Sequence, residues 1–220
     1  MPRETFQNEL EELQSEVMIM GSMVEKAIAL SIKALKDRSM AVAEQIVQDD
    51  ELINEKRFDI EENCVRLIAT QQPMASDLRT IISSIHLATD LERMGDYAAG
   101  IAEITLILRD DPRLKPLVDI PKMAELGMQR LGDSLKAFVD RDAERAKQIA
   151  LEDDTVDSLY NKVLSKCITA MIEDPENVPI ATRIIWVAHK LERISDRVTN
   201  ICERVVFTVT GRMEELDDSG

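Results

Sequence analysis

The chain repeats itself in register over nearly its whole length. The pattern L-E-R-x-x-D occurs at Leu91–Asp96 and again at Leu191–Asp196, 100 residues later. Around both copies, apolar residues alternate at spacings of three and four, which is the pattern of a helix that buries one face. Apolar residues seven apart, with one cysteine on their face, also recur 103 positions on: Ile46, Ile53, Ile60, Leu67 and Cys64, then Ile149, Val156, Val163, Ala170 and Cys167. This period predicts a tandem structural repeat.

Helix-breaking residues divide each copy into three helices. The first helix ends near residues 36–39, and its equivalent ends at 139–142. The middle helix ends at Gln71–Pro73, and its equivalent ends at Glu173–Pro179, because proline disfavours helix in the residue before it. The predicted fold class is therefore all-α, a tandem repeat of two three-helix bundles.

The same breaks give the expected domain boundaries. Residues 1–112 should form the first bundle and residues 122–212 the second. Residues 113–121 contain Pro116 and Pro121 and are expected to be the linker. The acidic tail, residues 213–220, is expected to be frayed, as chain ends commonly are.

Composition excludes several classes of function. The formal net charge is −15, which argues against a nucleic-acid or anionic-membrane surface, since both attract Lys and Arg. No uncharged run exceeds about ten residues, so no transmembrane segment is expected. The three cysteines show no C-x-x-C spacing and lie in helical patterns, which is typical of buried thiols in a reducing compartment. With no apolar leader segment at the N-terminus, these features predict a cytoplasmic protein.

Each third helix carries an acidic face. Glu92 and Asp96 are one turn apart, as are Glu192 and Asp196, and such like-charged pairs repel by about 0.2–0.5 kcal/mol on an isolated helix. One interpretation is a solvated face, in which water screens the repulsion. The other is a face that binds a cation.

A second acidic pair lies near the start of each middle helix. The first copy reads Asp50-x-x-x-Asn54 and the second Asp153-x-x-x-Asp157. If the middle and third helices run antiparallel, these pairs meet those of the third helices. Oxygen ligands of this kind suit hard cations such as Mg²⁺, Ca²⁺, Mn²⁺ or ferric iron.

No catalytic constellation is recognisable. His86 and His189 do not recur between the copies, and neither follows a glutamate at the spacing used in di-iron bundles. No glycine-rich phosphate-binding loop is present in the sequence. We therefore expect a binding protein rather than an enzyme.

Five segments together resemble the PhoU family of bacterial phosphate-transport regulators. They are M-G-S-M-V-E at 20–25, Q-P-M-A-S-D-L-R at 72–79, the two L-E-R-x-x-D segments at 91–96 and 191–196, and N-I-C-E at 200–203. The resemblance covers nearly the full length. It implies two related three-helix bundles.

The resemblance also implies a function and a set of partners. A PhoU-like protein relays the state of a phosphate ABC transporter, through components such as its ATPase subunit, to a sensor histidine kinase, and keeps phosphate-starvation genes off when phosphate is plentiful. Its contact with the membrane is peripheral and occurs only through these partners.

The resemblance further implies bound metal ions, of uncertain identity among Fe, Zn, Mn and Mg. The positions that match the family's metal motifs are Glu92, Asp96, Glu192, Asp196, Asp50, Asp153 and Asp157, with Asn54 departing from the acidic pattern. Because of Asn54, the first site is expected to bind more weakly than the second, or to bind a different ion.

Three alternatives remain open at this point. The chain could be an accessory subunit of a secondary phosphate transporter, a metal-dependent carboxylate enzyme, or a helical scaffold with a solvated acidic face. In addition, Ile85, Ile104 and Ile107 lie off the core stripe of the third helix. Exposed aliphatic residues there predict a covered surface, and we expect a homodimer.

Overall fold

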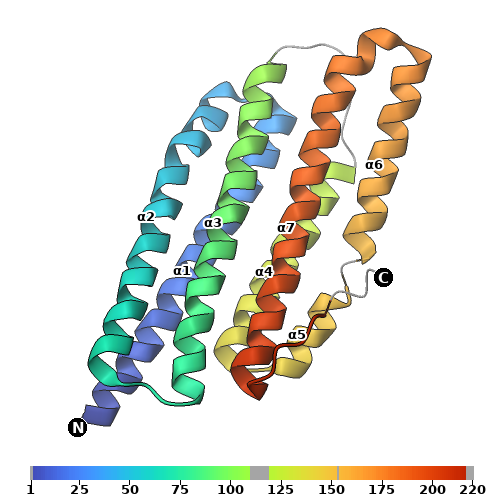
Figure 1. Cartoon of the computed structure of the whole chain (residues 1–220). Helices are drawn as coiled ribbons and strands as arrows, with labels where there is room; N and C mark the ends of the chain where they lie inside the picture. The colour runs from blue at the N-terminus through green and yellow to red at the C-terminus, as the bar shows by residue number, and fades with distance from the viewer. Residues whose placement is uncertain (1, 110–118, 153, 217–220) are drawn as a thin grey trace.

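The computed structural model describes residues 2–109, 119–152 and 154–216 (Figure 1). These residues form helices and no strand, which confirms the all-α prediction. The elements are α1 (Pro2–Asp37), α2 (Met40–Gln71), α3 (Ser76–Leu108), α4 (Asp119–Asp140), α5 (Ala143–Ala150), α6 (Asp154–Glu173), the short 3-10 helix η1 (Pro175–Asn177) and α7 (Val178–Thr210). None of these helices combines the length and apolar character needed to cross a bilayer.

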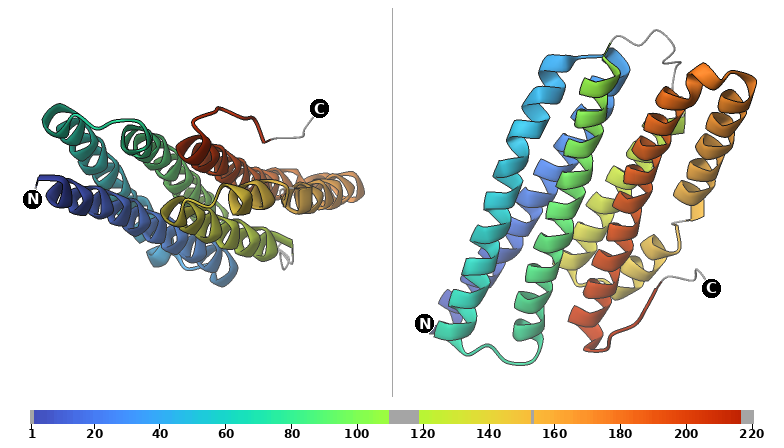
Figure 2. Two further views of the ribbon diagram at one scale, coloured as in Figure 1. Left: turned by 90° about the horizontal axis from the view of Figure 1, so that it is seen from below. Right: turned by 45° about the horizontal axis from the view of Figure 1, so that its top comes forward.

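The helices form two bundles that pack side by side. Helices α1, α2 and α3 contact one another in the first bundle, and α4, α5, α6 and α7 form the second, whose middle helix is divided. Two helix pairs join the bundles, α3 with α7 and α1 with α4. Helices α2 and α6 lie on opposite flanks, and among the described helices neither contacts the other bundle (Figures 1 and 2). The two predicted three-helix units are confirmed.

Backbone and side-chain details establish the register between the first helices of the two units. Arg38 ends α1 with a left-handed φ of 55°, and Arg141 ends α4 with a φ of 54°. Ser31 and Ser134 are both buried, and each hydroxyl donates to the carbonyl three residues earlier, at 2.9 and 2.8 Å. Both pairs are 103 positions apart, so position 27 of α1 corresponds to position 130 of α4.

A single large apolar core runs through both bundles. Of the heptad-spaced residues, all are buried except Ala170, which is half-buried. Burying a Leu or Ile side chain stabilises a fold by about 1.5–3 kcal/mol. The three cysteines are buried and free, as predicted, and burial raises the pKa of the Cys64 thiol to about 12. Cys64 is therefore an unreactive thiol that packs in the core.

The prediction of one continuous middle helix in the second unit is wrong. Helix α5 ends at Ala150 and α6 begins at Asp154, whereas α2 is unbroken. The sequence around the break is acidic. The equivalent run Asp49 to Glu51 is equally acidic and lies inside the continuous α2, so acidic charge alone does not cause the break.

A buried arginine stabilises this break. Arg130 is 3% exposed, and its Nε and Nη2 donate to the carbonyl of Ile149 at 3.3 and 3.1 Å. Ile149 lies in the last turn of α5, where carbonyls lack helical partners. Arg130 also donates to the hydroxyl of Ser195 on α7. The first unit has Ala27 at the position of Arg130.

Two predicted boundaries need correction. Helix α4 begins at Asp119, so residues 119–121 of the expected linker are helical. Pro121 is tolerated there because the first turn needs no backbone donor. Residues 110–118 and 217–220 lie outside the described part of the chain.

The tail is not frayed over residues 213–216. The Leu216 amide donates to Glu203 Oε1 at 3.0 Å, and Glu214 pairs with Lys147 at 3.0 Å. Leu216 also packs against the core. The tail therefore folds back along α7 toward α5 (Figure 2).

Candidate cation-binding faces

In the first unit, α2 and α3 approach closely at Gly95. A Cβ atom on Gly95 would lie 3.0 Å from Ile53 Cδ1 and 3.3 Å from Asp50 Oδ1. The missing side chain thus lets the Asp50 carboxylate reach the acidic face of α3. Asp50 is thus the acidic position of the middle helix that reaches α3, at the residue before Asp96.

The electrostatics of these carboxylates agree with this approach of α2 to α3. Burial, followed by the carboxylates of Asp96 and Glu92, raises the pKa of Asp50 to about 6. Burial and then Asp96 also raise the pKa of Glu92, against the opposing effect of Arg57. Asn54 is half-buried one turn after Asp50. Asp50, Glu92 and Asp96 therefore share one electrostatic environment.

The equivalent face of the second unit is arranged differently. Asp196 Oδ2 accepts from Arg193 Nη1 at 2.8 Å. Glu192 Oε2 lies 3.1 Å from His189 Nδ1, but without hydrogen-bond geometry. Asp157 is exposed in the first turn of α6, and Asp153 lies outside the described residues. In the second unit, therefore, Arg193 and His189 lie beside the carboxylates of Asp196 and Glu192 on the same helix.

Sequence reasoning missed His189, because it has no counterpart in the first repeat. Its ring also lies 6.2 Å from that of Tyr160, centroid to centroid. Only its spacing of three residues from Glu192 could have indicated the contact.

The side chains do not form a closed metal site. Within residues 2–109, 119–152 and 154–216, no group of three or more His, Cys, Asp or Glu is positioned to hold a metal ion. The donor type in the first unit is nevertheless the carboxylate oxygen that hard cations prefer. The metal assignment therefore stays a prediction, with its chemical basis strongest at Asp50, Glu92 and Asp96.

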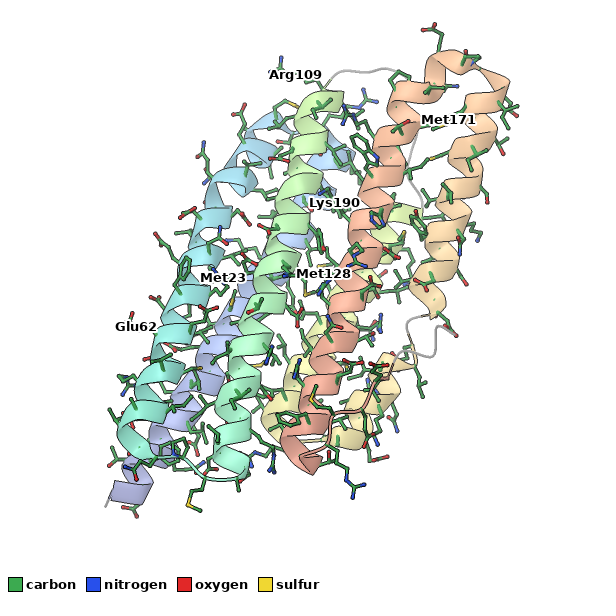
Figure 3. The ribbon with its side chains drawn as sticks, in the orientation of Figure 1. Met23, Glu62, Arg109, Met128, Met171 and Lys190 are labelled. Atoms are coloured by element: carbon green, nitrogen blue, oxygen red, sulfur yellow. The ribbon has the colours of Figure 1, made fainter. Side chains whose placement is uncertain are left out.

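The seam between the units is polar at two equivalent places. Asp90 on α3 accepts from Arg197 at 3.3 Å and from Asn200 at 3.4 Å, both on α7. One hundred positions on, Lys190 of α7 reaches back to α3, with its Nζ 5.9 Å from the ring centroid of Tyr97 (Figure 3). A Cβ atom on Gly100 would collide with this lysine.

The predicted exposed face of α3 is mostly covered within the chain. Ile104 is 4% exposed, Ile85 packs against the core, and Ile107 is 58% exposed. Helix α7 packs along α3. The expected aliphatic surface is therefore reduced to Ile107.

Comparisons with known proteins match this architecture. A model described as "PhoU domain" matches residues 17–105 and again 120–205. The chain is 38% identical over 219 residues to a phosphate-specific transport system accessory protein PhoU homologue of Clostridium acetobutylicum, covering 99% of this chain and 100% of the relative. A homologue of the same description from Aquifex aeolicus is 39% identical over 185 residues, covering 84% of each chain.

Two crystal structures share the fold. The phosphate transport system regulatory protein PhoU from Streptococcus pneumoniae superposes with a TM-score of 0.88 at 34% identity, covering 95% of this chain and 99% of that one. PhoU from Pseudomonas aeruginosa gives a TM-score of 0.88 at 36% identity, covering 94% and 100%. With both repeats matched by the family model and relatives matched from end to end, this chain belongs to the PhoU family.

Proposed function

We propose that the protein regulates phosphate uptake and phosphate-starvation signalling. In this proposal it couples a cytoplasmic ATPase subunit of a phosphate ABC transporter to a sensor histidine kinase and represses starvation genes when phosphate is plentiful. The observation that carries the proposal is the end-to-end match to relatives described as accessory proteins of phosphate-specific transport. The protein acts by binding, and no catalytic step is assigned to it.

Deleting the gene tests the regulatory part. In phosphate-rich medium the deletion strain is expected to express its phosphate-starvation genes, and the wild-type gene should restore repression. Unchanged expression in the deletion strain would contradict negative regulation. Normal expression with impaired phosphate uptake would instead favour an accessory role in a secondary transporter.

We also propose that a metal cation, with Mn²⁺, Mg²⁺, Fe or Zn²⁺ as candidates, binds the acidic faces. The first unit is the better supported site, because the Asp50 carboxylate reaches α3 at Gly95 and its pKa is raised by burial and then by the carboxylates of Asp96 and Glu92. In the second unit Asp196 is already paired with Arg193. Asn54 alone predicts the opposite order of affinity, with the second unit as the stronger site.

Thermal unfolding tests the cation. An ion that binds only the folded state raises Tm by mass action, so added Mn²⁺ should raise Tm and EDTA should lower it. The double variant E92Q/D96N is expected to lose most of this response, and E192Q/D196N to lose less. An equal response from all three proteins would overturn the proposal.

Self-association is the last part of the proposal. Ile107 offers an exposed aliphatic contact on α3, and we expect a homodimer. A light-scattering mass equal to the 24.8 kDa of one chain, at high protein concentration, would refute it.

A further inference from the structure

The first unit contains a pocket of about 140 Å³ at its outer side. Its walls are mainly apolar, and Gly95 and Asp50 contribute to its lining. Lys26, Asp49 and Leu52 line it as exposed residues. The remaining lining residues are Met23, Ala27, Leu30, Ile46 and Ile53, of which Met23 is labelled in Figure 3. A dry cavity of about 150 Å³ admits a ligand as large as benzene.

The second unit shows what fills the equivalent space. In the register given by Ser31 and Ser134, Ala27 corresponds to Arg130, and the heptad register pairs Ile46 with Ile149. In the register of the L-E-R-x-x-D segments, Gly95 corresponds to Ser195. The carbonyl of Ile149 and the hydroxyl of Ser195 both accept from Arg130. The guanidinium of the second unit therefore occupies the place that Ala27 and Gly95 leave open in the first.

The first unit supplies a different acceptor at this place. Its α2 is continuous, so the carbonyl of Ile46 lies within a helix rather than at a helix end. Asp50 instead brings a carboxylate to the pocket. No described residue pairs with this carboxylate or donates a hydrogen bond to it. A half-buried anion without a counter-charge is a strong acceptor for a guanidinium.

We propose that this pocket receives an arginine side chain of a partner protein, with its guanidinium on the Asp50 carboxylate and its stem against Met23, Ala27 and Leu30. The net charge of −15 favours a basic partner surface. Arginine is favoured over lysine because its planar fork binds a carboxylate through two hydrogen bonds, and because Arg130 occupies the equivalent place. The inference rests on the partner docking in the proposed function, and it concerns the metal-free protein, because a cation on Asp50 would compete with the guanidinium for the same carboxylate.

An NMR titration in EDTA tests the pocket directly. The probe is N-acetyl-L-arginine methylamide, and its uncharged isostere, N-acetyl-L-citrulline methylamide, is the matched control. The arginine probe should shift the amide signals of Asp50, Gly95 and α1 near Ala27, and the citrulline control should not. Free L-arginine should bind more weakly, because its own carboxylate would approach Asp49 and Asp50. Equal binding would favour the free amino acid and overturn the partner assignment.

Two substitutions locate the binding. Asp50→Asn should weaken the probe by about tenfold or more, as expected for loss of a charge-assisted pair. Asp59→Asn, at an exposed position of the same helix outside the pocket lining, should retain binding. Ala27→Arg should place the chain's own guanidinium in the pocket and abolish probe binding. Ala29→Arg, an exposed position on the same helix, is its control.

The outcomes separate this inference from the proposed function. If the probe causes no shifts, or binds D50N as it binds the wild type, the arginine pocket is refuted even where Mn²⁺ still raises Tm. If A27R folds and binds the probe like A29R, the pocket assignment is also refuted. Should A27R fail to fold, the comparison of D50N with D59N decides alone.

Discussion

The two repeats keep the same packing and differ in charge. Positions 27 and 95 of the first unit hold alanine and glycine, and their equivalents in the second hold Arg130 and Ser195, which bond to each other. The unit with the small residues has a continuous middle helix and a pocket beside them, and the unit with the arginine has a broken helix and a buried guanidinium at the equivalent place. Apolar stripes thus determine where helices pack, while a few polar positions determine whether each helix continues.

The acidic faces differ in exposure as well. Asp96 and Glu103 of the first unit are exposed, while Asp196 and Glu203 of the second are half-buried. The tail explains part of this difference, since the amide of Leu216 donates to Glu203. The first unit therefore presents the more accessible acidic surface.

The largest expected effect comes from removing the arginine of the second unit. Arg130→Ala should lower the free energy of unfolding by about 3 kcal/mol, because the Ile149 carbonyl and the Ser195 hydroxyl lose a buried donor and a cavity remains. Urea denaturation measures the change, with exposed Gln129→Ala as the control. Similar losses in both variants would show that Arg130 does not sustain the difference between the units.

The seam between the units gives the next largest effect. Asp90→Asn should lower stability by about 2 kcal/mol, because it leaves Arg197, whose side chain is 14% exposed, without its counter-charge. Lys190→Met at the equivalent position should cost only about 0.5 kcal/mol, the low end for a cation–π contact, because Nζ lies as far as 5.9 Å from the Tyr97 ring centroid. Chemical denaturation of both variants compares the two places of the seam. The double variant D90N/R197M measures the coupling energy between Asp90 and Arg197.

Asp50 should make stability depend on pH. Its folded pKa of about 6 exceeds the ordinary value of 3.8, so between these values the folded state holds more protons than the unfolded state. Stability contributed by the protonated group is then present below pH 3.8 and lost as pH rises through 6. Asp50→Asn should therefore stabilise the protein at pH 7, by about 1 kcal/mol after allowance for solvent screening, and have little effect at pH 3.5.

Melting temperatures of wild type, D50N and D49N across this range provide the measurement for Asp50. A D50N advantage that is constant with pH would rule out titration of Asp50 as its source.

The smallest effect is expected at the tail. Leu216→Ala should lower stability by about 0.5 kcal/mol, since the side chain is only half-buried. Hydrogen exchange at the amide of residue 216 should accelerate as its bond to Glu203 is released. An unchanged exchange rate would mean that packing of Leu216 does not hold the tail on α7.

Much of this architecture could be predicted from the sequence because it depends on local periodicity. The buried stripe from Ile53 to Leu67 and the break near Asp142 follow from residues close in the chain. The break between α5 and α6 could not be predicted, since it depends on a cap donated by Arg130 from another helix. The sequence also predicts the acidic faces. It does not predict that His189 and Arg193 contact the carboxylates of the second unit, because these contacts depend on side-chain placement.

The seam has a consequence for symmetry. If this seam joined two identical chains, position 90 and its equivalent on the other side would hold the same residue. Both would then be aspartate, or both would be lysine. Covalent linkage of the two copies removes that restriction. Asp90 can then meet Arg197 and Asn200 while Lys190 meets Tyr97 and Gly100. The α3–α7 seam thus has the geometry of a homodimer contact, with a pairing of charges that only a heterodimer or a fused chain can carry.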